Sequence, residues 1–138
     1  MTNDAPLDED NATPSARDVE LYRAVFEVNA AVKLLIDPET GAIVDANEGA
    51  ATFYGYAKAE LRTMNIAELN VLPSELIRQE MERARAERRS FFRFRHRVAS
   101  GEVRDVEVYS GPFVWSGRTL LLSRSEEHTS ELQSRYVI

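Results

Sequence analysis

The chain has 138 residues, of which 43% are hydrophobic and 29% charged, as expected for one globular domain. It contains no cysteine, which excludes disulfide bonds and fits a reducing compartment. No apolar run approaches the length of a membrane span, and the acidic start of the chain differs from the basic start of a secretory signal peptide. We therefore expect a cytoplasmic protein that is not associated with a membrane.

The first predicted element is a helix that follows an acidic tail. Residues 1–14 are polar and contain two prolines, so we expect them to be disordered. A helix is predicted to begin at Ser15, because Asp18 follows three residues later as in a capping box. We expect its apolar stripe to pack on a second copy of the chain, giving a homodimer, or on the outer face of a sheet. The stripe comprises Val19, Tyr22, Val25 and Phe26.

A β-hairpin and short helices come next. Residues 32–36 and 42–45 are predicted strands, joined by a turn that contains Asp, Pro and Gly. Asn47 is placed to cap a following helix, and Gly55 suits its C-terminal end, where positive φ is favourable for glycine. Helices are predicted over residues 48–54, 57–63 and 74–89.

Three further strands are predicted over residues 91–99, 103–115 and 119–122. The resulting order of elements indicates an α+β fold, with a five-stranded antiparallel sheet and helices packed on one face. In the first of these strands the arginines alternate with aromatic residues and His96, so the two kinds of side chain face opposite ways.

The register of the second hairpin follows from matching its charges. We favour the pairing that places Arg97 opposite Asp105 and Arg95 opposite Glu107, because charges then match on one face. A two-residue turn at 100–101 would instead place His96 opposite Asp105.

The C-terminal residues have an unusual sequence. Residues 124–134 read R-S-E-E-H-T-S-E-L-Q-S, and one set of codons for this stretch resembles the start of a common sequencing adapter. We interpret residues 124–138 as a non-native tail that does not pack. On this interpretation the domain covers residues 15–123, with a truncated last strand that stops near Ser123.

The region around the first hairpin resembles the PAS domain family. Residues 42–56 read A-I-V-D-A-N-E-G-A-A-T-F-Y-G-Y. In that family a hairpin ends in an asparagine that caps a short helix, which a Gly-Tyr pair closes. Asn47, Gly55 and Tyr56 match these positions, whereas Glu48 departs from the frequent N-P-A.

Two later segments extend the resemblance. Residues 56–61, Y-A-K-A-E-L, are similar to the family's Y-S-x-E-E-L, and residues 91–113 resemble its long second hairpin. The similarity covers about residues 20–123 and implies the PAS fold.

In PAS relatives the space between the helices and the sheet holds ligands, and this implies a set of candidate pocket residues. The plainer interpretation, which we favour, is that these side chains form the core. His96 is the only polar member on its strand face, and could bind a ligand or be satisfied internally. The candidates are Leu34, Ile36, Phe53, Leu61, Ile77, Met81, Phe92, Phe94, His96, Val106 and Val108.

Several cofactors and activities are disfavoured. Light-sensing relatives bond flavin or a chromophore through a cysteine, and haem-binding relatives take a histidine from the long helix; this chain has neither. Non-covalent flavin or a small metabolite stays open. No metal site is expected from two histidines. There is no phosphate loop or nucleophile motif, so no catalytic residue is assigned.

The arginines between Arg83 and Arg97 are interrupted by acids, so we expect no nucleic-acid binding. The resemblance implies a sensory input domain that binds a small ligand or partner. It would pass a conformational change to an output domain of histidine kinase or diguanylate cyclase type. The alternative is a ligand-free dimerisation and relay module.

Overall fold

The computed structural model describes residues 13–28 and 30–127. Five strands form one antiparallel sheet in the order β2-β1-β5-β4-β3, which confirms the expected α+β class. Most of the predicted acidic tail, and residues 128–138, lie outside the described residues. The strands are β1 (Val32–Ile36), β2 (Ile43–Ala46), β3 (Phe92–Arg97), β4 (Val103–Trp115) and β5 (Arg118–Glu127).

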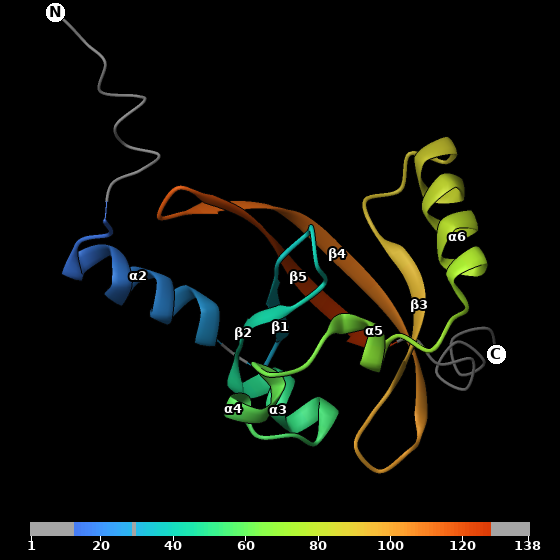
Figure 1. The fold of residues 1–138 in the computed structure, drawn as a ribbon, viewed down its shortest axis with the longest axis horizontal. Helices are drawn as coiled ribbons and strands as arrows, with labels where there is room; N and C mark the ends of the chain where they lie inside the picture. The colour runs from blue at the N-terminus through green and yellow to red at the C-terminus, as the bar shows by residue number, and fades with distance from the viewer. Residues whose placement is uncertain (1–12, 29, 128–138) are drawn as a thin grey trace, which may run out of the picture.

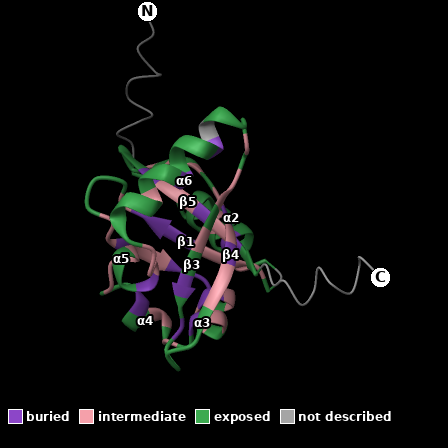
Figure 2. Cartoon of the chain, turned by 90° about the vertical axis from the view of Figure 1, so that its right-hand side faces the viewer, coloured by how far each residue is buried: buried purple, intermediate pink, exposed green. Residues whose placement is uncertain are grey.

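Helices lie on both sides of this sheet and at one edge (Figure 1). The short helices α3 (Glu48–Tyr54), α4 (Lys58–Leu61) and α5 (Ile66–Leu69) cover the face that we call the inner face. The N-terminal helix α2 (Ala16–Glu27) lies on the opposite, outer face. The longest helix, α6 (Ser74–Ala86), stands beside the β3 edge and is exposed along most of its length (Figure 2).

The caps of α2 and α3 form as their sequences predict. The Ser15 side chain accepts a hydrogen bond from the backbone N–H of Asp18, whose carboxylate accepts one in return, completing a capping box. Asn47 caps α3 by accepting from the N–H of Ala50, and Gly55 ends the helix at a φ of 80°. Both helices are too short to be stable without these caps and the sheet beneath them.

The sequence did not predict α5. The Asn65 side chain caps it by accepting from the Ala67 N–H, and the Asn65 backbone N–H donates to the Glu68 carboxylate. The N-x-x-E spacing of these two residues is a capping-box pattern that could have indicated the helix. The predicted helix over 57–63 is reduced to the single turn of α4, and the predicted helix over 74–89 ends at Ala86, shortly before Arg88 adopts a φ of 55°.

The expectation that the last strand stops near Ser123 is wrong, and so, for residues 124–127, is the expectation that the tail does not pack. β5 continues to Glu127 between β1 and β4, pairing Ser125 with Val32 on one side and Val108 on the other. Ser123 and Ser125 are buried on the inner face, and the Ser123 hydroxyl bonds that of Ser110 at 2.7 Å. Backbone pairing on both sides holds a strand even where serines replace apolar residues. The non-native origin of residues 124–138 stays a prediction.

Both registers considered for the second hairpin are also wrong. Arg95 lies opposite Asp105 and Arg93 opposite Glu107, two positions away from the favoured pairing. The charges still match on one face, because a shift of two residues preserves which side chains share a face. The turn determines this two-residue change of register. The Val98 N–H donates to the Glu102 carbonyl, so the hairpin is centred on Ser100.

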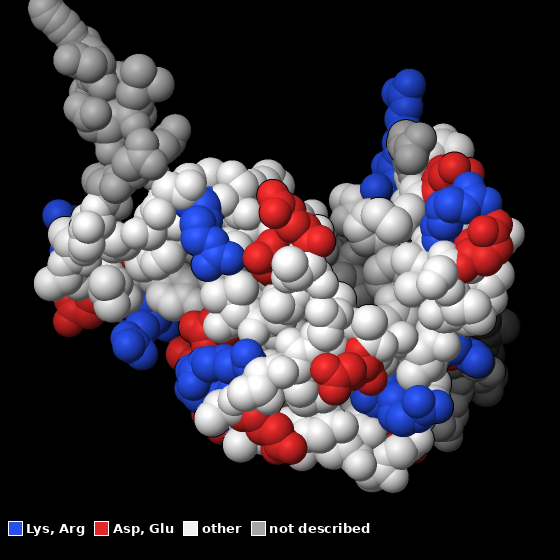
Figure 3. Space-filling view, in the orientation of Figure 1, with Lys and Arg blue, Asp and Glu red and all other residues white. Residues whose placement is uncertain are grey.

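The main core lies between the inner face of the sheet and α3 to α5. Tyr54, Leu61 and Leu69 are fully buried there, and Ile43 joins them from β2. Buried residues follow the strands beneath these helices (Figure 2). Acidic and basic side chains are interspersed over the face shown in Figure 3, with no broad area of one sign.

Candidate functional site

The inner face holds a buried polar pair where PAS relatives are expected to bind ligands. The Tyr54 hydroxyl and His96 Nδ1 are 2.8 Å apart, and His96 is only 2% exposed. α3 supplies the tyrosine and β3 the histidine, so the pair links the helical layer to the edge of the sheet. Of the two interpretations of His96, the described contacts match a histidine satisfied within the protein.

Burial sets the protonation of this pair. It lowers the pKa of His96 to about 4, because the imidazolium would lose its hydration. Burial also raises the pKa of Tyr54, an effect that Ser125 partly opposes. Near neutral pH both groups are therefore uncharged, and the tautomer of His96 determines which of the two donates the hydrogen bond.

Most of the candidate pocket residues lie together in the hydrophobic core of the inner face. Leu34, Ile36 and Leu61 belong to the main cluster, and Phe53 packs against it. Phe92, Phe94, Val106 and Val108 share the inner face of β3 and β4 with His96. Ile77 is half-buried on α6, whereas Met81 is 47% exposed and does not line this interior.

Only Phe53 among these candidates borders one of three described cavities. That cavity, of about 400 Å³, lies at the start of α3 beside Gly49. A side chain at Gly49 would collide with the carbonyl oxygen of Ala31, 2.1 Å from an ideal Cβ position, so the chain entering β1 packs directly on the helix backbone. The other two cavities are on the outer face.

The outer face carries an aromatic cluster beneath α2. Tyr22 stacks on Phe26 at 5.1 Å between ring centroids, and lies 5.9 Å from Phe113 and 5.1 Å from Trp115 of β4. Phe26 is buried, whereas Val19 and Val25 are largely exposed. The apolar stripe of α2 thus packs on the outer face through two of its four predicted members.

A groove of about 280 Å³ lies between α2 and this face. Its walls are Tyr22, Phe26, Phe113 and Trp115, and Leu122 of β5 contributes to its lining. A smaller cavity of about 210 Å³ lies on the other side of Tyr22, toward Asp45 and Arg118. The outer face therefore has open space beside its aromatic cluster, whereas the cavity described on the inner side lies at its margin, beside Gly49.

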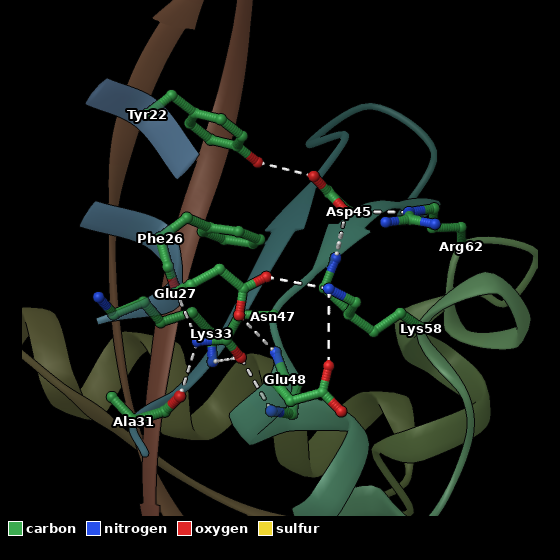
Figure 4. A network of polar contacts seen from close by, with 12 residues as sticks. Tyr22, Phe26, Glu27, Ala31, Lys33, Asp45, Asn47, Glu48, Lys58 and Arg62 are labelled. Carbon is green, nitrogen blue, oxygen red and sulfur yellow. Dashed lines mark hydrogen bonds and ion pairs between the residues drawn. The ribbon is translucent and has the colours of Figure 1, made fainter. Parts of the chain in front are cut away.

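A polar network ties the C-terminal half of α2 to the rest of the domain (Figure 4). Asn47, with no exposed surface, donates to the carbonyls of Phe26 and Ala31, each at 2.8 Å. Its oxygen accepts from the N–H groups of Lys33 and Ala50. One side chain thus joins the end of α2, the start of β1 and the start of α3.

Charged side chains extend this network. Glu27 of α2 accepts from the Glu48 N–H at 2.9 Å and pairs with Lys58 of α4 at 3.1 Å (Figure 4). The Lys33 ammonium donates to the Val25 carbonyl at 2.7 Å, where a cation complements the negative end of the helix dipole. These contacts connect α2 directly to α3 and α4.

Tyr22 connects the aromatic cluster to the same network. Its hydroxyl donates to Asp45 at 2.8 Å, and Asp45 also accepts from Arg62 at 2.9 Å. Burial, and then this bond to the carboxylate, raise the pKa of Tyr22. Sequence reasoning missed these partners, because residues 17 or more positions apart carry no local signal of contact.

Comparisons with known proteins identify the family. Residues 31–125 match the sequence model of the PAS domain. The chain belongs to the PAS domain family. It is also 36% identical over 104 residues to diguanylate cyclase DgcM of Escherichia coli strain K12. That match covers 73% of this chain but 25% of the cyclase, so the chain spans about a quarter of the curated relatives that it matches.

Solved structures agree on the fold. A PAS domain from a two-component sensor histidine kinase superimposes with a TM-score of 0.65 at 15% identity, covering 81% of this chain and 97% of that one. The PAS domain of the HTR-like protein from Haloarcula marismortui gives 0.64 at 20% identity, with coverage of 81% and 93%. The Rhodobacter sphaeroides LOV protein gives 0.62 at 19% identity, with coverage of 82% and 68%.

PAS domains are sensory rather than catalytic modules, and that is the general role of this domain. None of the helices formed by residues 13–28 and 30–127 has the length and apolar character to cross a bilayer.

Proposed function

We propose that this PAS domain is the input module of a larger signalling protein, and that it passes a conformational change to an output domain. The 36% identity to a diguanylate cyclase carries this proposal and favours a cyclase output over a histidine kinase. The domain itself has no catalytic role in this proposal. A cytoplasmic location is part of it, and is supported by the absence of cysteine.

The route of the signal in this proposal runs through α2. Its contacts with Asn47, Lys58 and Asp45 bind it to the helices and strand that border the inner face. A stimulus that moves α3 or α4 changes these bonds, and α2 then shifts on the aromatic cluster of the outer face. A ligand drives such a shift only through unequal affinity for the two positions of α2.

A second candidate is a dimerisation and relay module without a ligand. It is favoured by the exposed apolar residues of α2, since Leu21 is 62% and Val25 54% exposed. The packed core cluster on the inner face is compatible with this alternative. In both candidates α2 relays the signal. They differ in whether a ligand is needed to move α2.

The relay is tested by a chimera in which this domain replaces the PAS region of diguanylate cyclase DgcM. Glu27→Ala removes the contacts of α2 with Glu48 and Lys58, and should change cyclase activity severalfold. Glu20→Ala is the matched control, because it removes an acid from the exposed side of the same helix. Equal activities of the two variants and the parent chimera would overturn the proposed route.

A further inference from the structure

The groove between α2 and the outer face has the features of a ligand site that is separate from the inner face. We propose that it binds a small anionic amphiphile, with its apolar body against the aromatic walls and its carboxylate at Lys33. This inference deepens the proposed sensory function by giving the stimulus a chemical class and a place.

The walls of the groove select an apolar body. Tyr22 and Phe26 stack from α2, and Phe113 and Trp115 stack at 5.8 Å from β4, so flat hydrocarbon surfaces face the space from both sides. Leu21 and Val25 form its rim and are largely exposed. Covering such surface with an aliphatic chain removes apolar area from water and is therefore favourable.

The charge at one end selects the head group. Two charged residues line the groove, Asp18 and Lys33. The Asp18 carboxylate accepts from the Ser15 N–H within the capping box. Lys33 uses one of its three N–H donors on the Val25 carbonyl, and no carboxylate pairs with it among the described residues.

A neighbouring cation strengthens the preference for an anion. Arg124 lies directly opposite Lys33 in the β1–β5 pairing, and both side chains are on the outer face. Like charges in this arrangement repel each other. Arg124 stacks on Tyr109 and pairs with Glu126, so Lys33 is the cation of the described groove lining that can bind a ligand. The full positive charge of Lys33 is larger than the roughly half negative charge at the C-terminal end of α2, so a net positive charge remains there.

The length of the groove determines which molecule is a suitable probe ligand. It runs along α2 from Asp18 to Val25, seven residues and thus about 10 Å of helix. Octanoate supplies an aliphatic body and a carboxylate of this scale, and octan-1-ol is the matched uncharged control.

Trp115 is the only tryptophan of the chain, so its fluorescence reports on the groove directly. Octanoate should give a saturable change in this signal, with affinity about tenfold higher than octan-1-ol, as a hydrogen bond to a charged group implies. Lys33→Met should lose this advantage and Lys33→Arg should retain it. Arg23→Met removes a charge from α2 outside the groove and should have no effect.

Each other outcome overturns the inference. Equal binding of octanoate and octan-1-ol, unchanged in Lys33→Met, would show an apolar cleft without an anion site. An unchanged Trp115 signal together with concentration-dependent dimers in sedimentation would show that a second copy fills the groove. An unchanged signal from a monomer would show an empty groove. None of these outcomes changes the result expected of the cyclase chimera. Ligand binding in the groove and the relay through α2 are therefore tested independently.

Discussion

The two faces of the sheet are built differently. The inner face is covered by three short helices, and its buried Tyr54 and His96 are paired with each other. Within residues 13–28 and 30–127, α2 is the helix that covers the outer face; it packs through Tyr22 and Phe26 and leaves a groove beside them. A closed face resists rearrangement, whereas a single helix held by a few polar bonds can shift at lower free energy.

Removing the side chain that joins the two faces should have the largest effect. Asn47→Ala deletes four hydrogen bonds, two of them buried and two partly buried, and leaves their backbone partners unsatisfied. We expect a loss of roughly 4 kcal/mol in the free energy of unfolding, measured with urea. Asn65→Ala is the control, because this asparagine caps α5 near the surface, and its loss should be about 1 kcal/mol. Equal losses would show that Asn47 is merely a helix cap.

The inner face should also respond to acid. The pKa of His96 is lowered to about 4, so the unfolded chain binds its proton first as pH falls below about 6.5. Stability from this residue is present above that pH and is lost progressively toward pH 4, by on the order of 3 kcal/mol.

The measurement is urea unfolding of the protein and of His96→Gln at pH 7, 6 and 5. The variant should lose less stability over this range, and His128 is present in both chains, so its contribution cancels. The same slope in both proteins would contradict a buried, neutral His96.

Substitutions on the outer face should have smaller effects on the free energy of unfolding. Tyr22→Phe keeps the ring stacking but deletes the bond to Asp45, and should lower unfolding free energy by about 1 kcal/mol. Leu21→Ala should change it by less than about 0.5 kcal/mol, because the side chain is exposed. Chemical denaturation of both variants checks this order. A larger loss for Leu21→Ala would indicate that α2 is buried in an assembly.

Local patterns in the sequence predicted most of the fold. Asn47 and Gly55 identified α3, and the alternation in β3 and β4 identified which side chains share a face. The register could not be predicted, because it depends on the geometry of a turn centred on Ser100. The end of β5 was missed for a related reason: pairing with β1 and β4 is non-local, and the serines in it give no strand signal.

The candidate site was predicted less well than the fold. The alternation of residues placed Phe92, Phe94 and His96 correctly on one face, but could not show whether that face is filled. The run of apolar residues at 34–36 was the available sign that both faces of β1 are covered, since alternation would leave one face polar. Leu35 is indeed buried on the outer face, beside the smaller cavity.

The contrast between the two faces is tested most directly by native-state hydrogen exchange at single residues. The amides of α2 should exchange through local opening, at free energies well below that of global unfolding, while those of β1 and β5 exchange only with global unfolding. Glu27→Ala should lower the opening free energy of α2 further and leave the strands unchanged. If α2 were as protected as β1, or if the amides around Tyr54 opened first, the account of a closed inner face and a movable outer helix would be contradicted.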